Sequence, residues 1–199
     1  QMQAGMPNAA KQGIGQFKAA KIAPFALGLG GNAVTVSNEL YAAMGAADPA
    51  ALAGPRAGSA QALARVIEQR RAAGEEPLTF GMVFPVSCHN YELRGWMAAA
   101  GIDPDADVQL TVIPPPRMVE SLRAGRIAGF CVGEPWNQAA VAEGLGRIVA
   151  TKSDLWSGGP EKVLGMRADW ATANAEVLTR LLRALASAAR CSCCCARIQ

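Results

Sequence analysis

The feature that most constrains the fold is an alternation of strand-like and helix-like segments between residues 77 and 137. Segments 78–84, 108–113 and 127–132 are apolar and are predicted strands, and a helical pattern follows each of them. Such repeated order favours a parallel or mixed sheet with helices on both faces. In open α/β sheets, ligands bind outside the carboxyl ends of the strands, so the loops that follow these strands are the candidate functional segments.

Apolar residues at helical spacing predict helices over residues 59–74 and about 174–190, and another that ends at Gly101. Pro135 is predicted as the first residue of a further helix. Residues 1–30 show no sustained period and are predicted to form loops and short elements. The residues expected to face the core are Leu63, Val66 and Ile67 in the first helix, Leu93, Trp96, Met97 and Ala100 in the one ending at Gly101, and Val177, Leu181, Leu182 and Leu185 in the last.

The composition indicates a globular protein that does not bind nucleic acid. Of the 199 residues, 51% are hydrophobic, which is enough to bury the core of one domain or two small lobes. The formal charge is only +3, and no run of Lys or Arg forms the stripe that grips a phosphate backbone. No apolar stretch is long enough to span a bilayer. Because the chain begins at Gln1 without an initiator Met, we expect it to be a fragment, in which a lost leader would leave no trace.

Six cysteines do not form a disulfide or metal framework in this sequence. Cys88 and Cys131 are isolated, and the other four crowd residues 191–195. A thiolate metal site needs spaced ligands that converge in a folded loop, and this crowded segment has neither the spacing nor a nearby His. We therefore predict no metal site and treat residues 191–199 as an irregular tail without a functional role.

Four segments resemble the nitrate- and bicarbonate-binding subunits of ABC transporters, in the wider superfamily of nitrate, sulfonate and taurine solute-binding proteins. The resemblance covers about residues 25–190, and order and spacing both fit. The segments are Ser87-Cys88-His89-Asn90-Tyr91-Glu92-Leu93-Arg94, Ile113-Pro114-Pro115-Pro116-Arg117-Met118-Val119, Gly129-Phe130-Cys131-Val132-Gly133-Glu134-Pro135-Trp136-Asn137 and Pro160-Glu161-Lys162.

The resemblance implies the two-lobed, hinged α/β fold of type II periplasmic binding proteins, with the first lobe incomplete. Residues 1–76 then belong to lobe I without its opening strands, residues 77–160 form lobe II, and residues 161–190 return to lobe I. The resemblance also implies nitrate (or nitrite) as the ligand, a periplasmic or membrane-anchored extracytoplasmic location, and the permease and ATPase subunits of a transporter as partners. It implies no cofactor and no catalysis.

The implied ligand site contains Lys162 as the positive charge, with His89 and Asn32 as hydrogen-bond donors from the ring and the amide. Backbone around Val132 and Gly133 and a wall formed by Pro115 complete it. Nitrate is a planar anion whose oxygens only accept hydrogen bonds, so its pocket needs donors and one balancing charge. A buried anion without that charge would be too costly.

Three of these residues carry specific expectations. A lone histidine is more often structural than ligand-binding, but the motif around His89 reverses that expectation. Related bicarbonate binders carry a carboxylate at the position of Lys162 and recruit a metal cation, so lysine favours nitrate without a metal. The better-known members have glutamine where this chain has Asn32, and the shorter side chain reaches less far.

Other polar and aromatic residues of the motifs are predicted to be structural. Glu134 lacks a second carboxylate at catalytic spacing and is expected to hold a turn or hinge. Trp96 and Trp136 are expected to pack, and Cys131 to be a small buried hydrophobic residue.

Three alternative functions remain open from the sequence. A cytoplasmic nitrate sensor that controls a regulatory partner would share the same pocket motifs. A binder of bicarbonate or another small anion is the second alternative. The least favoured is an enzyme similar to thiamin-pyrimidine synthases, which share the fold, because no nucleophile and base are paired around His89.

Overall fold

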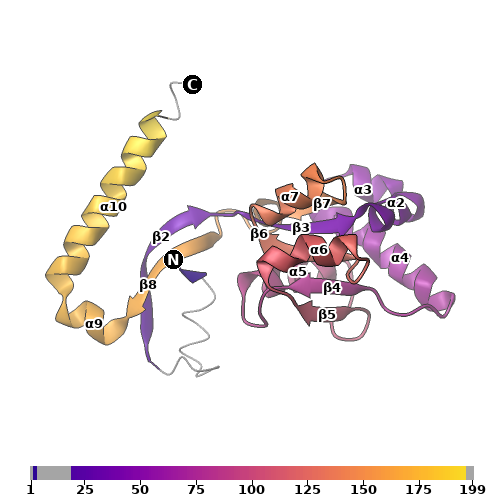
Figure 1. Ribbon diagram of the computed structural model, residues 1–199, viewed down its shortest axis with the longest axis horizontal. Coiled ribbons are helices and arrows are strands. Elements are labelled where there is room, and N and C mark those ends of the chain that lie inside the picture. Colours follow the sequence, from indigo (N-terminus) through magenta and orange to yellow (C-terminus); the bar gives the residue numbers. More distant parts are fainter. Residues whose placement is uncertain (1, 4–18, 196–199) are drawn as a thin grey trace. The chain divides into compact units, whose positions relative to one another are not determined.

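The computed structural model describes residues 2–3 and 19–195, and the chain divides into two compact units. The larger unit contains residues 28–161. The smaller unit contains the described residues before 28 and after 161 (Figure 1). No helix of the described residues is both long and apolar enough to cross a membrane.

The larger unit is built on a five-stranded mixed sheet with strand order β5-β4-β6-β3-β7. β4 pairs in parallel with β5 and β6, whereas β3 pairs antiparallel with β6 and β7. The predicted mixed α/β sheet is therefore confirmed. The strands are β3 (Asn32–Ser37), β4 (Thr79–Met82), β5 (Gln109–Val112), β6 (Gly129–Gly133) and β7 (Gly146–Thr151).

Helices cover both faces of this sheet, as predicted. Successive residues of a strand point to opposite faces. Accordingly, Cys131 of β6 joins the core cluster that includes α2, α4 and α5, whereas Phe130 and Val132 join the cluster that includes α6 and α7. The helices of this unit are α2 (Asn38–Ala47), α3 (Pro49–Ala53), η1 (Arg56–Ser59), α4 (Ala60–Ala72), α5 (Cys88–Ala98), η2 (Pro115–Arg117), α6 (Met118–Arg123), α7 (Trp136–Ala142) and α8 (Lys152–Leu155).

Local capping sets where several helices begin and end. The Ser37 and Ser87 hydroxyls accept hydrogen bonds from backbone N–H groups in the first turns of α2 and α5. Gly74 and Gly101 follow α4 and α5 with φ of +71° and +78°, a conformation that suits glycine. Pro135 stands at the N-cap of α7, one residue before the predicted position.

The predicted boundary between the lobes at residue 77 differs from the structure. Residues 28–76, expected in lobe I, belong to the same compact unit as residues 77–161. The reason is β3, whose Ala33 pairs with Val132 on one side and Thr151 on the other. A strand in the middle of the sheet cannot belong to another unit. The second division, between residues 161 and 162, falls one residue after the predicted one.

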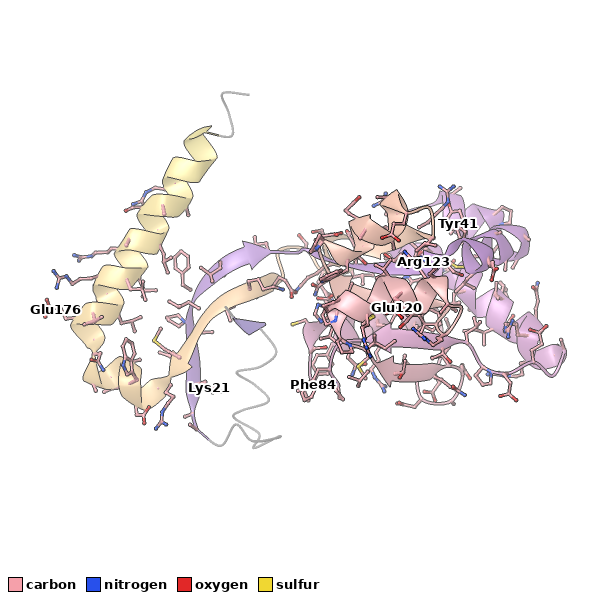
Figure 2. The ribbon with its side chains drawn as sticks, in the orientation of Figure 1. Lys21, Tyr41, Phe84, Glu120, Arg123 and Glu176 are labelled. Atoms are coloured by element: carbon pink, nitrogen blue, oxygen red, sulfur yellow. The ribbon has the colours of Figure 1, made fainter. Side chains whose placement is uncertain are left out.

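The smaller unit contains a three-stranded sheet of order β1-β8-β2, followed by two helices. Residues 21–29, predicted as loops and short elements, form a strand instead, which begins at Lys21 (Figure 2). Residues 191–195, predicted as an irregular tail, continue the last helix, and their side chains lie outside the described part. The elements are β1 (Met2–Gln3), β2 (Lys21–Leu29), β8 (Pro160–Arg167), α9 (Ala168–Ala173) and α10 (Ala175–Cys195).

The prediction that α10 buries its apolar face is wrong for this structure. Val177 and Leu181 are 53% and 38% exposed, and Leu182 and Leu185 are only half-buried. Neither core cluster of the described residues includes a residue of α10. Helical periodicity specifies which residues share a face, but burial also requires an element that packs on that face.

We expect Gly129→Ala to destabilise the larger unit, because an added Cβ would lie 2.7 Å from the Thr35 carbonyl oxygen of the neighbouring strand. Overpacking of this kind typically costs about 1 to 3 kcal/mol. Gly28→Ala is the matched control, since its Cβ would meet nothing within 4 Å. Denaturant unfolding of both variants checks this, and equal midpoints would contradict the close strand approach.

Candidate functional site

Four of the six predicted site residues meet where β3 begins and β6 ends. Asn32, the first residue of β3, pairs with Gly133, the last residue of β6, and Val132 precedes it. His89 lies in the first turn of α5, which follows the loop after β4. A Cβ built on Gly133 would lie 3.3 Å from Asn32 Oδ1 and 3.7 Å from His89 Nε2. The carboxyl end of the parallel strands is thus where polar groups converge, as expected for this class of sheet.

The other two predicted residues lie elsewhere in the chain. Pro115 begins η2 after β5 and is half-buried. Lys162 is the first residue of the second segment of the smaller unit, where it lies in β8 and pairs with Gln3.

Behind Asn32 lies a buried cluster of charged residues that no sequence motif predicted: Glu92 of α5, Lys152 of α8 and Glu161 of β8. All three are at most 4% exposed. Lys152 Nζ donates to Glu161 Oε2 at 2.7 Å and to the Pro160 carbonyl oxygen at 2.9 Å. It also lies 3.1 Å from Glu92 Oε1, outside good hydrogen-bond geometry. One ammonium group therefore serves two buried carboxylates.

Asn32 joins this cluster to the convergence point of His89 and Gly133. Its Nδ2 donates to Glu92 Oε2 at 2.8 Å and to Glu161 Oε2 at 2.7 Å. Both amide hydrogens are therefore taken, and Oδ1 has no hydrogen-bond partner among the described residues. The amide cannot turn over without placing Oδ1 against two carboxylates. In this arrangement, Asn32 links parts of the site structurally. Its amide is not available to donate to the anion, which was the role predicted for it.

Burial and charge shift the acid-base equilibria of the cluster. Burial raises the pKa of Glu92 above its usual value, although the hydrogen bond from Asn32 and the charge of Lys152 oppose this. Burial opposes the charged form of Lys152, but the hydrogen bond to Glu161 and the charge of both carboxylates outweigh it, so the pKa of Lys152 is raised. Burial and the neighbouring Glu92 raise the pKa of Cys131 well above the usual value, so this buried thiol stays protonated, in agreement with its predicted role as a small apolar residue.

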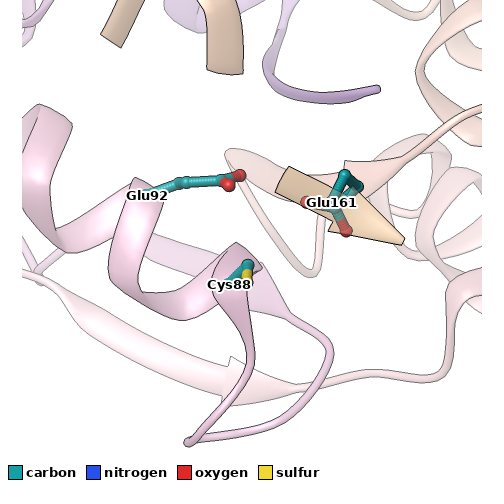
Figure 3. A group of neighbouring side chains, drawn as sticks. All are labelled: Cys88, Glu92 and Glu161. Carbon is teal, nitrogen blue, oxygen red and sulfur yellow. The ribbon is translucent and has the colours of Figure 1, made fainter. Parts of the chain in front are cut away.

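One group of potential metal ligands exists among the described residues. The ligand atoms of Cys88, Glu92 and Glu161 lie within 4.8 Å of one another, and the two carboxylates face each other from α5 and β8 (Figure 3). The Lys152 ammonium already lies against both carboxylates. Since a cation occupies the position that a metal would need, we interpret the group as an ion-pair cluster.

The sequence held one signal for this cluster. Glu92 lies at helical spacing within the stripe of α5 that also contains His89, Leu93 and Trp96, all buried. A charged residue inside an apolar stripe indicates a buried partner, because an unpaired buried charge is very costly. Glu161 stands beside Lys162 in a motif but has no distinguishing pattern, and Lys152 gives no signal beyond its place after the capping residue Thr151.

The other motif residues mostly have the structural roles expected. Glu134 is exposed, and its carboxylate accepts from the Gln138 backbone in α7, which stabilises the turn. Trp96 is fully buried and donates to the Ser59 hydroxyl at 3.1 Å. Trp136 packs against the cluster that includes α6 and α7.

The curated proteins that are similar to this chain include one from Synechocystis sp. and one from Synechococcus elongatus. "Nitrate import ATP-binding protein NrtC" of Synechocystis sp. is 39% identical over 193 residues, which are 94% of this chain and 26% of that protein. "Nitrate/nitrite binding protein NrtA" of Synechococcus elongatus is 43% identical over 126 residues, which are 63% of this chain and 28% of that protein. The chain thus spans about a quarter of the length of these relatives.

The crystal structure of the periplasmic nitrate-binding protein NrtA from Synechocystis PCC 6803 matches with a TM-score of 0.74 and 28% identity. The match covers 92% of this chain and 44% of that chain. The predicted fold of periplasmic solute-binding proteins is therefore confirmed. The model of the NMT1-like family matches residues 1–195, and the chain belongs to this family.

Proposed function

We propose that the chain binds nitrate or nitrite as the solute-binding component of an ABC-type uptake system. The observation that carries the proposal is the convergence of Asn32, His89 and Gly133 in a chain whose fold matches that of a nitrate-binding protein. The relatives' names, which refer to nitrate import and to nitrate/nitrite binding, support the same ligand.

The proposed ligand contacts follow from the chemistry of nitrate. His89 donates from its ring, backbone near Val132 and Gly133 surrounds the anion, and Pro115 forms a wall. Lys162 supplies the positive charge, so no metal is needed. Asn32 holds the floor of this site through Glu92 and Glu161. We propose binding without chemical change of the anion, in keeping with a relative that is named for nitrate/nitrite binding.

The partners proposed for this function are the permease and ATPase subunits of the transporter, and the proposed location is extracytoplasmic. The periplasmic origin of the matched NrtA structure supports this location.

Calorimetric titration of the purified chain with sodium nitrate, with sodium chloride as the control for ionic strength, tests the proposal that the chain binds nitrate. We expect saturable heat from nitrate alone, and absence of nitrate-specific heat would refute the function.

A second candidate is a nitrate sensor that acts on another protein. The similarity to NrtC, named as a nitrate import ATP-binding protein, extends over 94% of this chain, so a segment of this kind also occurs in a protein that is not named for solute binding. Cell fractionation of the native host separates the two candidates. Recovery in the periplasmic fraction supports transport, and recovery in the cytoplasm supports sensing.

We expect Gly133→Ala to weaken nitrate binding by at least about tenfold, because the added methyl group would enter the space bordered by Asn32 and His89. Its nearest contact, 3.3 Å to Asn32 Oδ1, is tight but tolerable, so the fold should persist. Gly58→Ala is the control, since its Cβ would meet nothing within 4 Å. Unchanged affinity in Gly133→Ala, measured by calorimetry, would place the ligand elsewhere.

A further inference from the structure

A cavity outside the candidate functional site lies along β7, the strand at one edge of the five-stranded sheet. Its volume is about 350 Å³, which is within the range of small-molecule sites. Its walls come from α2, α3, η1, α7 and β7, so segments that are far apart in the sequence build it together. The cavity is therefore a product of the folded unit and not of one loop.

This cavity is separate from the site proposed for nitrate. Arg147, which lines the cavity, pairs with Val36 near the end of β3, whereas Asn32 stands at the beginning of that strand. A strand advances about 3.3 Å per residue, so the four residues between these positions span about 13 Å. The described residues that line the cavity include neither His89 nor Gly133. A ligand bound here would not occupy the nitrate site.

Two arginines share this cavity. Arg56 of η1 and Arg147 of β7 both line it, and both are exposed. Among the described residues, neither guanidinium group forms an ion pair or a hydrogen bond. Most other arginines of the larger unit do form ion pairs, namely Arg65, Arg70, Arg71, Arg94, Arg123 and Arg126. The cavity along β7 thus brings together two cations that no carboxylate of the described chain compensates.

The absence of carboxylates from its walls distinguishes this cavity from its neighbours. Two other cavities of the larger unit also contain arginines. Glu39 and Glu76 line one of them, and Glu76 and Asp107 line the other. No Asp or Glu is among the described residues that line the cavity along β7. A concave surface with charges of one sign concentrates ligands of the opposite sign, so this cavity favours an anion.

The arginines favour a phosphate group as the anion. A guanidinium group presents its N–H donors in a planar fork that fits the oxygens of a phosphate or a carboxylate. A phosphate monoester carries between about 1.5 and 2 negative charges at neutral pH, whereas a carboxylate carries one. Phosphate therefore balances Arg56 and Arg147 together, and the exposed position of both side chains allows them to turn toward one group.

The rest of the wall favours an aromatic body on the ligand. The Arg147 guanidinium carbon lies 5.2 Å from the centre of the Tyr41 ring, a cation–π contact on a residue that is labelled in Figure 2. Leu52, Val141 and Ile148 add apolar surface to the cavity. Val141 is 40% exposed, so part of this apolar surface is open to a ligand. Small-molecule sites commonly combine such apolar walls with a few polar groups.

We propose that the cavity along β7 is a second ligand site, which binds a phosphate monoester with an aromatic body. Arg56 and Arg147 bind the phosphate oxygens, and Tyr41, Leu52 and Val141 pack against the ring of the ligand. This site does not depend on the proposed function, because it shares no residue with the nitrate site.

The test is nuclear magnetic resonance titration of the isotopically labelled chain with phenyl phosphate. We expect saturable shifts centred on residues 147–149 and on η1. Arg56→Met and Arg147→Met should each weaken binding by at least about tenfold, because each removes hydrogen bonds to a charged group. Arg117→Met is the matched control, since Arg117 is another exposed arginine and does not line the cavity. It should bind phenyl phosphate like the wild type.

A second variant separates the shape of the cavity from its charge. Val141→Trp places a bulky ring in the cavity wall without changing any charge, and the exposure of Val141 should allow the fold to persist. It should also lose phenyl phosphate binding. Inorganic phosphate should bind the wild type at least about tenfold more weakly than phenyl phosphate, because it buries no apolar surface.

The other outcomes would overturn the proposal. Absence of saturable shifts refutes the second site, and shifts centred on His89 and Gly133 place the ligand in the nitrate site instead. An equal loss of affinity in Arg117→Met shows that only the total charge matters. Inorganic phosphate that binds as tightly as phenyl phosphate refutes the aromatic class of ligand. None of these results depends on whether the chain binds nitrate.

Discussion

Replacement of Lys152 by methionine is expected to lower the free energy of unfolding at neutral pH by about 3 to 5 kcal/mol, the typical cost of removing one partner from a buried ion pair. Methionine nearly keeps the length of the side chain but removes the ammonium group that lies against both Glu92 and Glu161. It also removes the hydrogen bond to the Pro160 carbonyl oxygen. Denaturant unfolding monitored by circular dichroism measures the loss.

Acid should partly restore the stability of this variant. Burial already raises the pKa of Glu92, and the loss of the Lys152 charge removes one of the effects that oppose this, so the folded variant binds more protons at Glu92 than the unfolded chain does. The penalty from Glu92 is therefore absent below its unfolded pKa and grows as pH rises through its folded pKa. Arg65→Met is the control, since Arg65 and its partner Glu68 are both 61% exposed and such pairs contribute at most about 1 kcal/mol. Equal losses in the two variants would show that Lys152 is not buried as described.

Replacement of Lys162 by glutamate is expected to abolish nitrate binding. If Lys162 is the counter-charge, the substitution puts two negative groups into one desolvated site, and loss of a buried charge partner costs about 3 to 5 kcal/mol. Because every 1.4 kcal/mol corresponds to about tenfold in affinity, the expected loss is at least about two orders of magnitude. Calorimetric titration with nitrate, with and without calcium, measures the loss of affinity. The same titration with bicarbonate should show binding only when calcium is present, because the new carboxylate and the anion then share one cation.

Lys162→Met separates charge from shape in this experiment, because it nearly keeps the length of the side chain and deletes its charge. Lys162→Met should lose nitrate binding as Lys162→Glu does, but calcium should not enable it to bind bicarbonate. Lys21→Met is the control for the loss of another lysine of the smaller unit. If Lys162→Met binds nitrate as tightly as the wild type, another group balances the anion.

Much of the fold could be predicted because it depends on local patterns. Apolar runs located β4, β5 and β6, and helical spacing located α4 and α5 within a few residues. The unit boundary could not be predicted in this way. It depends on β3, a central strand whose partners β6 and β7 are about a hundred residues away in the sequence.

The candidate site likewise has one part that could be predicted from local motifs and one part that could not. Motif residues such as His89 and Gly133 could be named from the sequence, and the structure brings them together. The cluster of Glu92, Lys152 and Glu161 could not be predicted from the sequence. Its members come from α5, α8 and β8, and charged residues are normally exposed. The two hydrogen bonds that the Asn32 amide donates could not be predicted for the same reason, since both go to these buried carboxylates.

The two ends of the larger unit lie side by side, since the Gly30 N–H donates to the Gly159 carbonyl oxygen at 3.2 Å. Asn32 and Glu161, close to those ends, are hydrogen-bonded to each other. A unit whose two ends adjoin can be inserted between two neighbouring positions of another unit, as a short loop can. The entropic cost of closing such an insertion is little higher than that of a short loop, because closure entropy grows only slowly with loop length. Residues 28–161 therefore have the geometry of a cassette that can be excised, or circularly permuted, without cutting the central sheet.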